Sequence, residues 1–263
     1  MAIASLDDYI GSAKQMLSFF KYSTRSTAAG GWYTVADLAG TPRMSSLAGS
    51  STTQGVVPVD TDSGFPVINS FSSGDTGYLS RVNGGCVAAM VVVFDLLFKA
   101  GAYAHNANTG LTSQPSYSGR LPGSSYEGLE IWVEAATNIS GNIAVEATYT
   151  NEGGTGSRTT AAAVVNGPSQ GRCWNLPLQA GDRGVQKIDN VKGTGAFSGT
   201  FNVLVMRRLF ISRPSATNIV DVANIFKTGM PQVFDDSAIY PLVRATGNTN
   251  TGLLEVDIEI ASA

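Results

Sequence analysis

The hydrophobic and polar positions along the chain predict many short strands around one central strand. A long apolar run, Thr200–Ser212, is rich in β-branched and aromatic residues and lies between Gly199 and Pro214. A run of this composition, bounded by turn residues, indicates a central strand buried on both faces. We expect the other strands to pack against it, and Arg207 and Arg208 to mark where it reaches solvent.

Further strands are predicted where apolar residues alternate with polar ones or form short runs between turns. They lie at Trp32–Leu38, Tyr78–Val82, Cys86–Lys99, Leu129–Ala135, Ile143–Tyr149, Thr159–Val165, Arg172–Leu176, Val185–Val191 and Leu254–Ile260. Gly141 and Asn142 predict a turn that joins Leu129–Ala135 and Ile143–Tyr149 into a hairpin. Many antiparallel strands with long polar loops predict a mainly β protein with an antiparallel β-sandwich or jelly-roll body.

The N-terminal segment shows helical rather than alternating spacing. Ser5 and Asp8 form a capping box of the Ser-x-x-Asp kind, which marks a helix start. Apolar residues at helical spacing follow through Lys21, namely Leu6, Tyr9, Ile10, Ala13, Met16, Leu17 and Phe20. We therefore expect an amphipathic helix of about four turns. Its apolar stripe either packs on its own domain or docks against another subunit, and both interpretations stay open. A second, short helix is expected over Thr217–Gly229.

The stretch 39–74 combines many Gly, Ser, Thr and Pro residues with isolated apolar anchors. These anchors are Val56, Val57, Val59, Phe65, Val67, Ile68 and Phe71. The stretch is too apolar for a disordered linker and too irregular for regular structure, so we expect an extended arm lying on a surface. The chain then divides into residues 1–75, the helix and arm, and residues 76–263, the β domain.

Composition narrows the classes of partner. Charged residues are 14% of the chain and the formal net charge is -3. A surface so sparsely charged is expected to be covered by neighbouring subunits, and an acidic balance argues against nucleic acid as a partner. No apolar run reaches the ~18 residues that a membrane span needs, and the N-terminus lacks the pattern of a signal peptide. Cys86 and Cys173 are interpreted as buried apolar residues, and a bond between them is left open.

Two motifs resemble chemical sites but lack the partners that the chemistry needs. Gly167–Gly171 matches the Gly-x-Ser-x-Gly nucleophile elbow, which requires a later histidine. The one histidine, His105, comes earlier in the chain and has no metal-ligating neighbours in sequence. Asp60–Gly64 resembles the start of a calcium loop, but Phe71 stands where the glutamate should be. Turns are the better interpretation of both motifs, and no metal or cofactor is expected.

Glu130 and Glu134 flank Trp132 on one strand face, an arrangement that resembles a glycosidase pair with a stacking platform. Residues four apart on a strand are about 13 Å apart, beyond the separation of either glycosidase class. We interpret both carboxylates as a solvated strand face and expect no enzymatic activity. A glycan hydrolase is kept as the enzyme alternative, because a partner carboxylate from elsewhere would complete the pair.

Three segments resemble virion structural proteins of tailed bacteriophages, of the type that decorates or cements the head shell. They are Ser5–Ile10 with Lys14 and Gln15, Leu176–Val185, and Leu254–Ala261. The resemblance implies a β-sandwich or jelly-roll body, self-association (often as trimers), the major capsid protein as partner, and no active site. It also implies location in the virion, after synthesis in the host cytoplasm.

The interface expected for a decoration protein combines the N-terminal apolar stripe with two aromatic residues, Trp32 and Phe65. Its residues are Leu6, Tyr9, Ile10, Met16, Leu17, Phe20, Trp32 and Phe65. Deletion of residues 1–75 is expected to abolish particle binding without unfolding the rest. The alternative function is a phage tail or receptor-binding component that stacks glycans on Tyr117, Tyr126 and Trp132.

Overall fold

The structure is a computed structural model that describes residues 3–49, 51–86, 90–212, 221–247 and 250–263. The chain forms two compact units, each assembled from segments far apart in the sequence. Unit 1 contains Met1–Ser45, Val59–Asp95 and Leu209–Ala263, and unit 2 contains Ser46–Pro58 and Leu96–Arg208. Strands β5 (Met90–Ala104) and β13 (Thr200–Ser212) each contribute one part to each unit.

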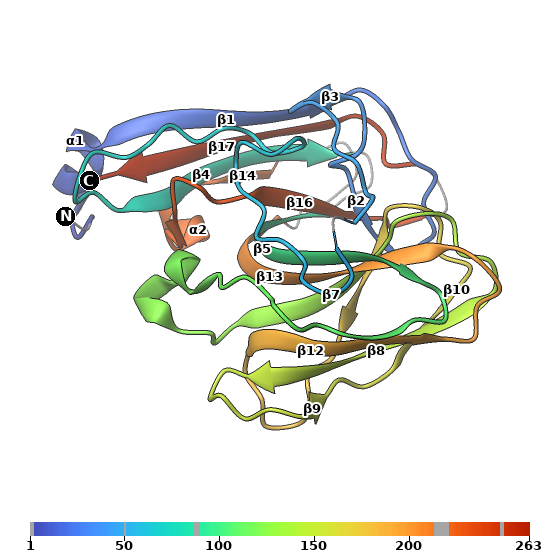
Figure 1. Ribbon diagram of the computed structural model, residues 1–263. Helices are drawn as coiled ribbons and strands as arrows, with labels where there is room; N and C mark the ends of the chain where they lie inside the picture. Colours follow the sequence, from blue (N-terminus) through green and yellow to red (C-terminus); the bar gives the residue numbers. More distant parts are fainter. Residues whose placement is uncertain (1–2, 50, 87–89, 213–220, 248–249) are drawn as a thin grey trace. The chain divides into compact units, whose positions relative to one another are not determined.

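Unit 1 contains two antiparallel sheets. The larger has the order β14-β4-β17-β1-β3, with β15 also paired to β4, and the smaller is the run β2-β16-β5, which forms part of a closed barrel. The bounds are β1 Ala13–Lys21, β2 Trp32–Thr34, β3 Gly40–Thr41, β4 Gly77–Cys86, β14 Asp221–Ala223, β15 Gln232–Val233, β16 Ile239–Arg244 and β17 Leu254–Ser262. β1 pairs with β17 along its whole length, which brings the two ends of the chain together (Figure 1).

Alternation along these strands builds the core of unit 1. Leu17 and Phe19 on β1 and Val256 on β17 pack against a cluster that includes Val91 and Val243 of the smaller sheet. All five side chains are buried in one hydrophobic cluster. The unit is therefore a sandwich, with the opposite face of the larger sheet carrying the polar positions of each strand.

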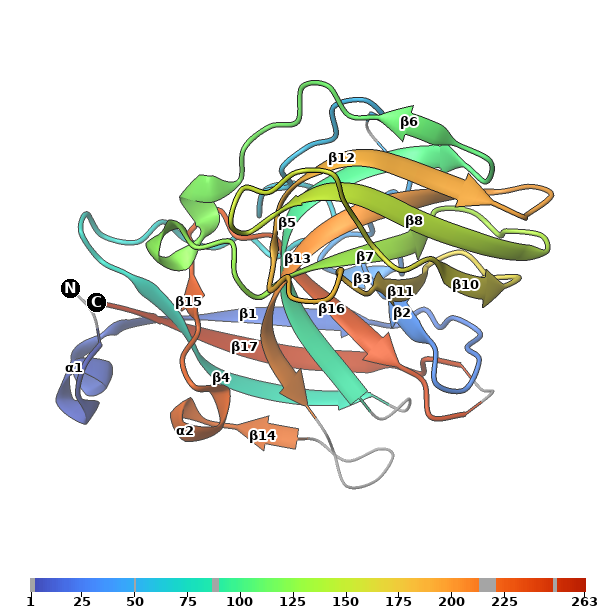
Figure 2. The same cartoon turned by 90° about the horizontal axis from the view of Figure 1, so that it is seen from below.

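Unit 2 repeats this arrangement with different strands. One layer is the run β5-β13-β7-β11 of the closed barrel, and the other is a sheet with the order β10-β8-β12-β6 (Figure 2), in which β9 also pairs with β8. The bounds are β6 Asn108–Gly110, β7 Leu129–Ala135, β8 Asn142–Asn151, β9 Arg158–Thr159, β10 Ala163–Asn166, β11 Arg172–Leu176 and β12 Val185–Thr194, with 3-10 turns η1 Ser118–Arg120 and η2 Pro122–Ser124. The sheets share a buried cluster that includes Val133 of β7, Val203 of β13 and Val145 of β8.

The predicted fold class is confirmed, and several strands agree with their predicted ranges. The central strand spans Thr200–Ser212 and is buried on both faces over most of its length. Leu129–Ala135 and Arg172–Leu176 also begin and end as predicted. The chain does not leave the core at both arginines, because Arg207 is buried and only Arg208 is exposed.

The four-turn N-terminal helix is wrong in its extent. α1 spans only Leu6–Gly11, and the residues from Ala13 to Lys21 form strand β1. The capping box itself is present, since Ser5 Oγ accepts from Asp8 N and Asp8 Oδ2 accepts from Ser5 N. A helix over this range would leave the long edge of β17 without its partner, and nine paired residues of β1 outweigh local helical spacing.

Two further predictions need correction. The strands β7 and β8 do not form a hairpin, because β7 pairs with β11 and β13 while β8 pairs with β9, β10 and β12. The segment between them crosses from one sheet of unit 2 to the other. The second helix is shorter than predicted, since α2 covers only Ile225–Thr228 and ends at Gly229, whose φ of 68° is the left-handed conformation of a helix end. The preceding residues 221–223 form β14, and residues 217–220 lie outside the described part.

The division into residues 1–75 and 76–263 stays a prediction about assembly, and the compact units group these segments differently. β1 lies within the larger sheet of unit 1, between β17 and β3. The stretch 39–74 is largely irregular, as expected of an arm, with Ser46–Pro58 in unit 2 and the residues from Val59 in unit 1. Deletion of residues 1–75 would remove β1 from a core-forming sheet, so it does not test binding separately from folding.

Candidate interaction surface

The outer face of β1, together with Tyr22 directly after the strand, presents exposed apolar side chains. Met16, Phe20 and Tyr22 are 48%, 44% and 61% exposed. The residues between them, Leu17, Phe19 and Lys21, are buried, as the alternation of a strand requires. The Phe20 and Tyr22 rings lie side by side, with centroids 6.4 Å apart. We call Met16, Phe20 and Tyr22 the β1 patch.

The helix α1 is fixed to the same outer face of the sheet. The hydroxyl of Tyr9 donates to Glu259 Oε1 at 2.7 Å, and Glu259 lies on β17 opposite Met16 in the strand register. Arg81 Nη2 is 3.5 Å from Glu259 Oε2 and 3.8 Å from the sulfur of Met16. Leu6 and Ile10 of the same helix are largely exposed. The helix therefore adds two apolar side chains near one end of the β1 patch.

The carboxylate of Glu259 is held in its charged form by these neighbours. Burial by itself would raise its pKa, but hydrogen bonds from Tyr9 and Ser80 and the positive charge of Arg81 outweigh burial and lower the pKa. The pKa of Tyr9 is raised, first by burial and then by its bond to Glu259. The attachment of α1 is thus a hydrogen bond to a carboxylate, which is stronger than one between neutral groups.

An acidic row runs beside the β1 patch. Glu255 and Asp257 of β17 stand opposite Phe20 and Ser18 in the strand register. Ser18 Oγ donates to Asp257 Oδ1 at 2.5 Å, and Glu255 is exposed. The surface therefore combines an apolar strip with a parallel strip of negative charge. A complementary partner would present apolar side chains next to lysines or arginines.

The eight predicted interface residues do not share one surface. Leu6, Ile10, Met16 and Phe20 are exposed, but Leu17 is buried in the core of unit 1 and Tyr9 is partly buried by its bond to Glu259. Trp32 and Phe65 are half-buried, Trp32 beneath the guanidinium of Arg244 and Phe65 beside Tyr240.

Helical spacing missed Tyr22, which belongs to the β1 patch. Alternation from Met16 through Ser18 and Phe20 would have found it.

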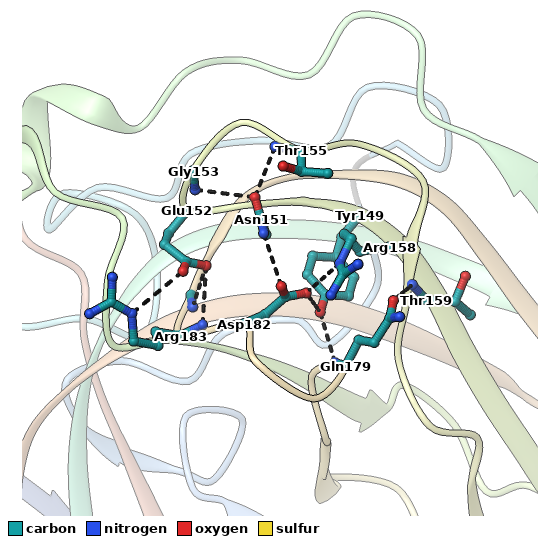
Figure 3. Close-up of polar contacts among 11 residues, drawn as sticks. Tyr149, Asn151, Glu152, Gly153, Thr155, Arg158, Thr159, Gln179, Asp182 and Arg183 are labelled. Carbon is teal, nitrogen blue, oxygen red and sulfur yellow. Dashed lines mark hydrogen bonds and ion pairs between the residues drawn. The ribbon is translucent and has the colours of Figure 1, made fainter.

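Unit 2 contains a polar cluster around Asp182 (Figure 3). Asp182 accepts hydrogen bonds from Tyr149 at 2.6 Å, Asn151 at 2.9 Å and Arg158 at 2.9 Å. Asn151 Oδ1 accepts in turn from Gly153 N and Thr155 N, which holds the turn after β8. The bond from Arg158 is the main cause that lowers the pKa of Asp182 to about 2, with burial opposing it and the other two bonds assisting.

Glu152 ties the neighbouring turn to the same cluster. Its Oε2 accepts from Arg183 N and Gly184 N, both at 3.1 Å, and Arg183 also pairs with Glu127 at 2.7 Å. Tyr149 accepts from Gln179 N at 2.9 Å while donating to Asp182, and burial raises its pKa to about 12. The polar atoms of the cluster are engaged with one another. These hydrogen bonds and ion pairs hold together loops that the sequence predicted only as glycine-rich turns.

We expect Asp182→Asn to destabilise the protein by about 1–3 kcal/mol at neutral pH, because a charged acceptor of three hydrogen bonds is lost. The folded-state pKa of Asp182 lies below its ordinary 3.8, so its stabilising effect is present above pH 3.8 and is lost as pH falls towards 2. Urea unfolding at pH 7, 4 and 3 should show the difference between wild type and variant shrinking with acid. Glu146→Gln, which breaks the exposed pair with Lys192, is the matched control and should change stability by less than ~1 kcal/mol.

The two chemical motifs are turns, as interpreted from the sequence. The Gly167–Gly171 segment connects β10 to β11, and the chain continues as a strand rather than a helix. In the Asp60–Gly64 segment, Asp60 accepts from Ile68 N and Asp62 accepts from Val59 N, so both carboxylates cap local backbone. His105 lies in a turn after β5. Among the described residues, no three His, Cys, Asp or Glu side chains gather as a metal site.

The carboxylates of β7 are not a solvated face. Glu134 is fully buried, where it contacts Asn202 and Lys99. Glu130 accepts from the indole N–H of Trp132 at 2.8 Å and pairs with Arg208 at 2.6 Å. The segment Ser46–Pro58 of unit 2 lies near the Glu134 side chain, since the carbonyl of Leu47 accepts from Asn202, which stands opposite Glu134 in the strand register.

The proposed glycan platform is also wrong in its residues. Tyr117 and Trp132 are buried, and only Tyr126 is partly exposed. Tyr117 instead donates to the backbone of Val185, so its hydroxyl is used inside unit 2. An aromatic groove built from these three residues is therefore absent.

Cys173 is buried, which fits its interpretation as a small apolar residue. The side chain of Cys86 lies outside the described part of the structure. Within the described residues, no helix has both the length and the apolar character needed to cross a membrane.

Comparisons with known proteins add little to this description. No protein-family model matches the chain, and no curated protein matches it. Among solved structures, the chain is similar to the infectious bursal disease virus Gx strain structure at 9% identity and a TM-score of 0.21. It is also similar to the VP2 subviral particle of infectious bursal disease virus at 10% identity and a TM-score of 0.20. Each alignment covers 95% of this chain and 80% of the other. These scores are below the range in which two chains share a fold.

Proposed function

We propose that the chain is a structural protein of a tailed-phage virion, of the head decoration or cement type, and that it binds the capsid shell through the β1 patch and α1. The observation that carries the proposal is the row of exposed apolar side chains on β1, continued by Leu6 and Ile10. The β1 patch lies on a well-paired sheet whose other face packs into the core of unit 1. An apolar row left open on a rigid sheet is a feature of a docking surface.

The resemblance of the sequence to phage decoration proteins supports the same assignment. Two of the three resembling segments, Ser5–Ile10 and Leu254–Ala261, form α1 and β17, which build the candidate surface together with β1. The proposed partner is the major capsid protein, at a site with apolar side chains beside basic ones that face the acidic row. Repetition of this modest contact over a symmetric shell gives avidity. The protein has no catalytic role in this proposal.

Self-association is part of the proposal, since decoration of a symmetric shell is served by closed oligomers such as trimers. Size-exclusion chromatography with light scattering gives the mass in solution. A multiple of the 27.4 kDa chain is expected. A monomer would leave the capsid contact as the sole interface.

The direct test uses virions assembled from the genome that encodes this chain. The chain should be found among their structural proteins by mass spectrometry, and purified chain should cosediment with particles stripped of it. Absence from purified virions would overturn the proposed function.

Replacing Met16, Phe20 and Tyr22 together by serine should weaken particle binding by about tenfold or more for each side chain, because the apolar area buried on docking is lost. Val164→Ser with Phe197→Ser is the matched control, since both residues are exposed apolar side chains of unit 2. Circular dichroism should confirm that both variants are folded. Wild-type binding by the triple variant would exclude the β1 patch as the contact while leaving a virion role in place.

A further inference from the structure

Three polar side chains with complementary chemistry are buried together inside unit 2. They are Lys99 on β5, Glu134 on β7 and Asn202 on β13. β13 lies between β5 and β7 in the sheet, and Asn202 stands opposite Glu134 in the strand register. Asn202 and Glu134 are fully buried, and the side chain of Lys99 is 14% exposed. The cluster combines an amine, a carboxamide and a carboxyl group, with very little access to water.

A single oxygen atom of Glu134 contacts both other side chains. Glu134 Oε2 accepts from Asn202 Nδ2 at 2.7 Å and lies 3.3 Å from Lys99 Nζ. The amine and the carboxamide nitrogen are therefore no further apart than these two distances added together. Asn202 Nδ2 also donates to the carbonyl of Leu47 at 2.6 Å, which fixes the orientation of the carboxamide.

The Asn202 carboxamide is held in one orientation, but its oxygen lacks a hydrogen bond from any described residue. Asn202 Oδ1 is buried and has no hydrogen-bond partner within the described part of the chain. Gly101 of β5 leaves this oxygen its space, because a Cβ at that position would come within 2.1 Å of it. An unpaired buried carbonyl and a buried ion pair both cost free energy. A reaction that consumes the ammonium charge would remove part of this cost.

From this geometry we infer that Lys99 and Asn202 become joined by an amide bond between Lys99 Nζ and Asn202 Cγ, formed by the folded chain itself with release of ammonia. Glu134 is the catalytic residue, because its Oε2 touches both the nucleophilic nitrogen and the leaving nitrogen. The buried site serves the reaction in two ways: it positions the reacting groups and it excludes the water that would compete with the amine.

The reaction balances with these three side chains alone. Glu134 takes one proton from the Lys99 ammonium, and the free amine attacks Asn202 Cγ to form a tetrahedral intermediate. Glu134 then gives its proton to Asn202 Nδ2, the Cγ–Nδ2 bond breaks, and ammonia leaves. The surplus proton remaining on Nζ is carried away by the ammonia as ammonium. One C–N bond forms, one breaks, Glu134 is regenerated, and no oxidant, reductant or metal is needed.

The product would connect β5 to β13 covalently within one sheet. A cross-link between residues far apart in sequence restricts the unfolded chain, as a long-loop disulfide does. It would also resist reduction, unlike a disulfide. Unit 2 would then be a covalently closed body that tolerates mechanical load.

Intact-mass spectrometry of the full-length, denatured chain tests the inference. The wild-type protein should be lighter than its sequence mass by one ammonia. Lys99→Arg, Asn202→Ala and Glu134→Gln should each have their full sequence mass. After proteolysis, tandem mass spectrometry of the wild type should identify a branched peptide containing both Lys99 and Asn202. A folded wild-type chain at full sequence mass would overturn the inference regardless of how the variants fold.

Loss of ammonia by succinimide formation is the outcome that must be separated from the cross-link. The chain contains two Asn-Gly pairs at Asn83 and Asn166, where succinimides form readily. A succinimide is hydrolysed by mild alkali and produces no branched peptide, whereas the amide survives. A mass loss that disappears in alkali, or that persists in Lys99→Arg, would therefore contradict the cross-link.

Discussion

Phe19→Ala should destabilise unit 1 by about 3–5 kcal/mol, whereas Phe20→Ala should change its stability by no more than ~0.5 kcal/mol. The two phenylalanines are neighbours on β1, but Phe19 is fully buried and Phe20 is 44% exposed. Truncating Phe19 leaves a cavity among Leu17, Val256 and their neighbours, which a rigid sandwich fills only in part. Truncating Phe20 removes a side chain that is already largely in water.

Urea unfolding followed by circular dichroism gives both free energies, and an unchanged m-value would show that the variants lose stability rather than compactness. The pair is its own control, because the same side chain is truncated at adjacent positions. Equal losses of unfolding free energy in the two variants would mean that buried and exposed side chains do not alternate over residues 13–21. That result would favour a helix over a strand. A larger loss for Phe20→Ala would mean that the register of β1 is shifted by one residue, which reverses its faces.

The strands that could be predicted from the sequence are those whose signal is local. Thr200–Ser212, Leu129–Ala135 and Arg172–Leu176 are apolar or alternating runs with turn residues at their ends. The pairing of strands is not a local property. β7 and β8 look like a hairpin because a turn pair separates them, but β7 pairs with β11 and β13, whereas β8 pairs with β9, β10 and β12.

The N-terminal segment shows why short apolar patterns are ambiguous. Met16 and Phe20 fit a helical stripe with Leu17, and they fit a strand face with Tyr22 equally well. The choice between helix and strand is made by β17, which lies more than 230 residues later and pairs with β1 from Ala13 to Lys21. The candidate surface could therefore be placed in the right segment from the sequence, but not on the right face.

Buried polar residues were the hardest part of the chain to predict. Glu134 alternates with Val133 and Ala135, which is the pattern of a half-exposed strand. The structure buries residues on both faces of β7, and the irregular segment Ser46–Pro58 approaches Glu134 through the bond between Leu47 and Asn202. A segment without periodicity gives no sequence signal of where it will pack. The cluster of Lys99, Glu134 and Asn202 could therefore not be predicted without knowing how the strands pair.

Lys21 is expected to make the stability of the protein rise with pH between about 8 and 10.5. Its side chain is fully buried on the inner face of β1, where Nζ donates to the carbonyls of Leu38 at 3.2 Å and Pro42 at 2.6 Å. Burial lowers its pKa from 10.5 to about 8, against the opposing effect of Asp37. Below pH 8 the amine is charged in both states and the cost of burying it is complete. Between the two pKa values only the unfolded chain binds the proton, so raising the pH favours the folded state.

The gain is at most about 3 kcal/mol, reached when both states are neutral. Urea unfolding of wild type and Lys21→Met at pH 7.5, 8.5 and 9.5 isolates the contribution of Lys21 to the free energy of unfolding. The buried tyrosines titrate in both proteins, so their contribution cancels in the difference. The stability of the wild type relative to the variant should increase steadily over this range. A difference that stays constant would show that Lys21 enters the core already neutral, or that the ammonium keeps contact with water. Because Lys21 points inward from the strand that carries the β1 patch, particle binding should not follow the same pH dependence.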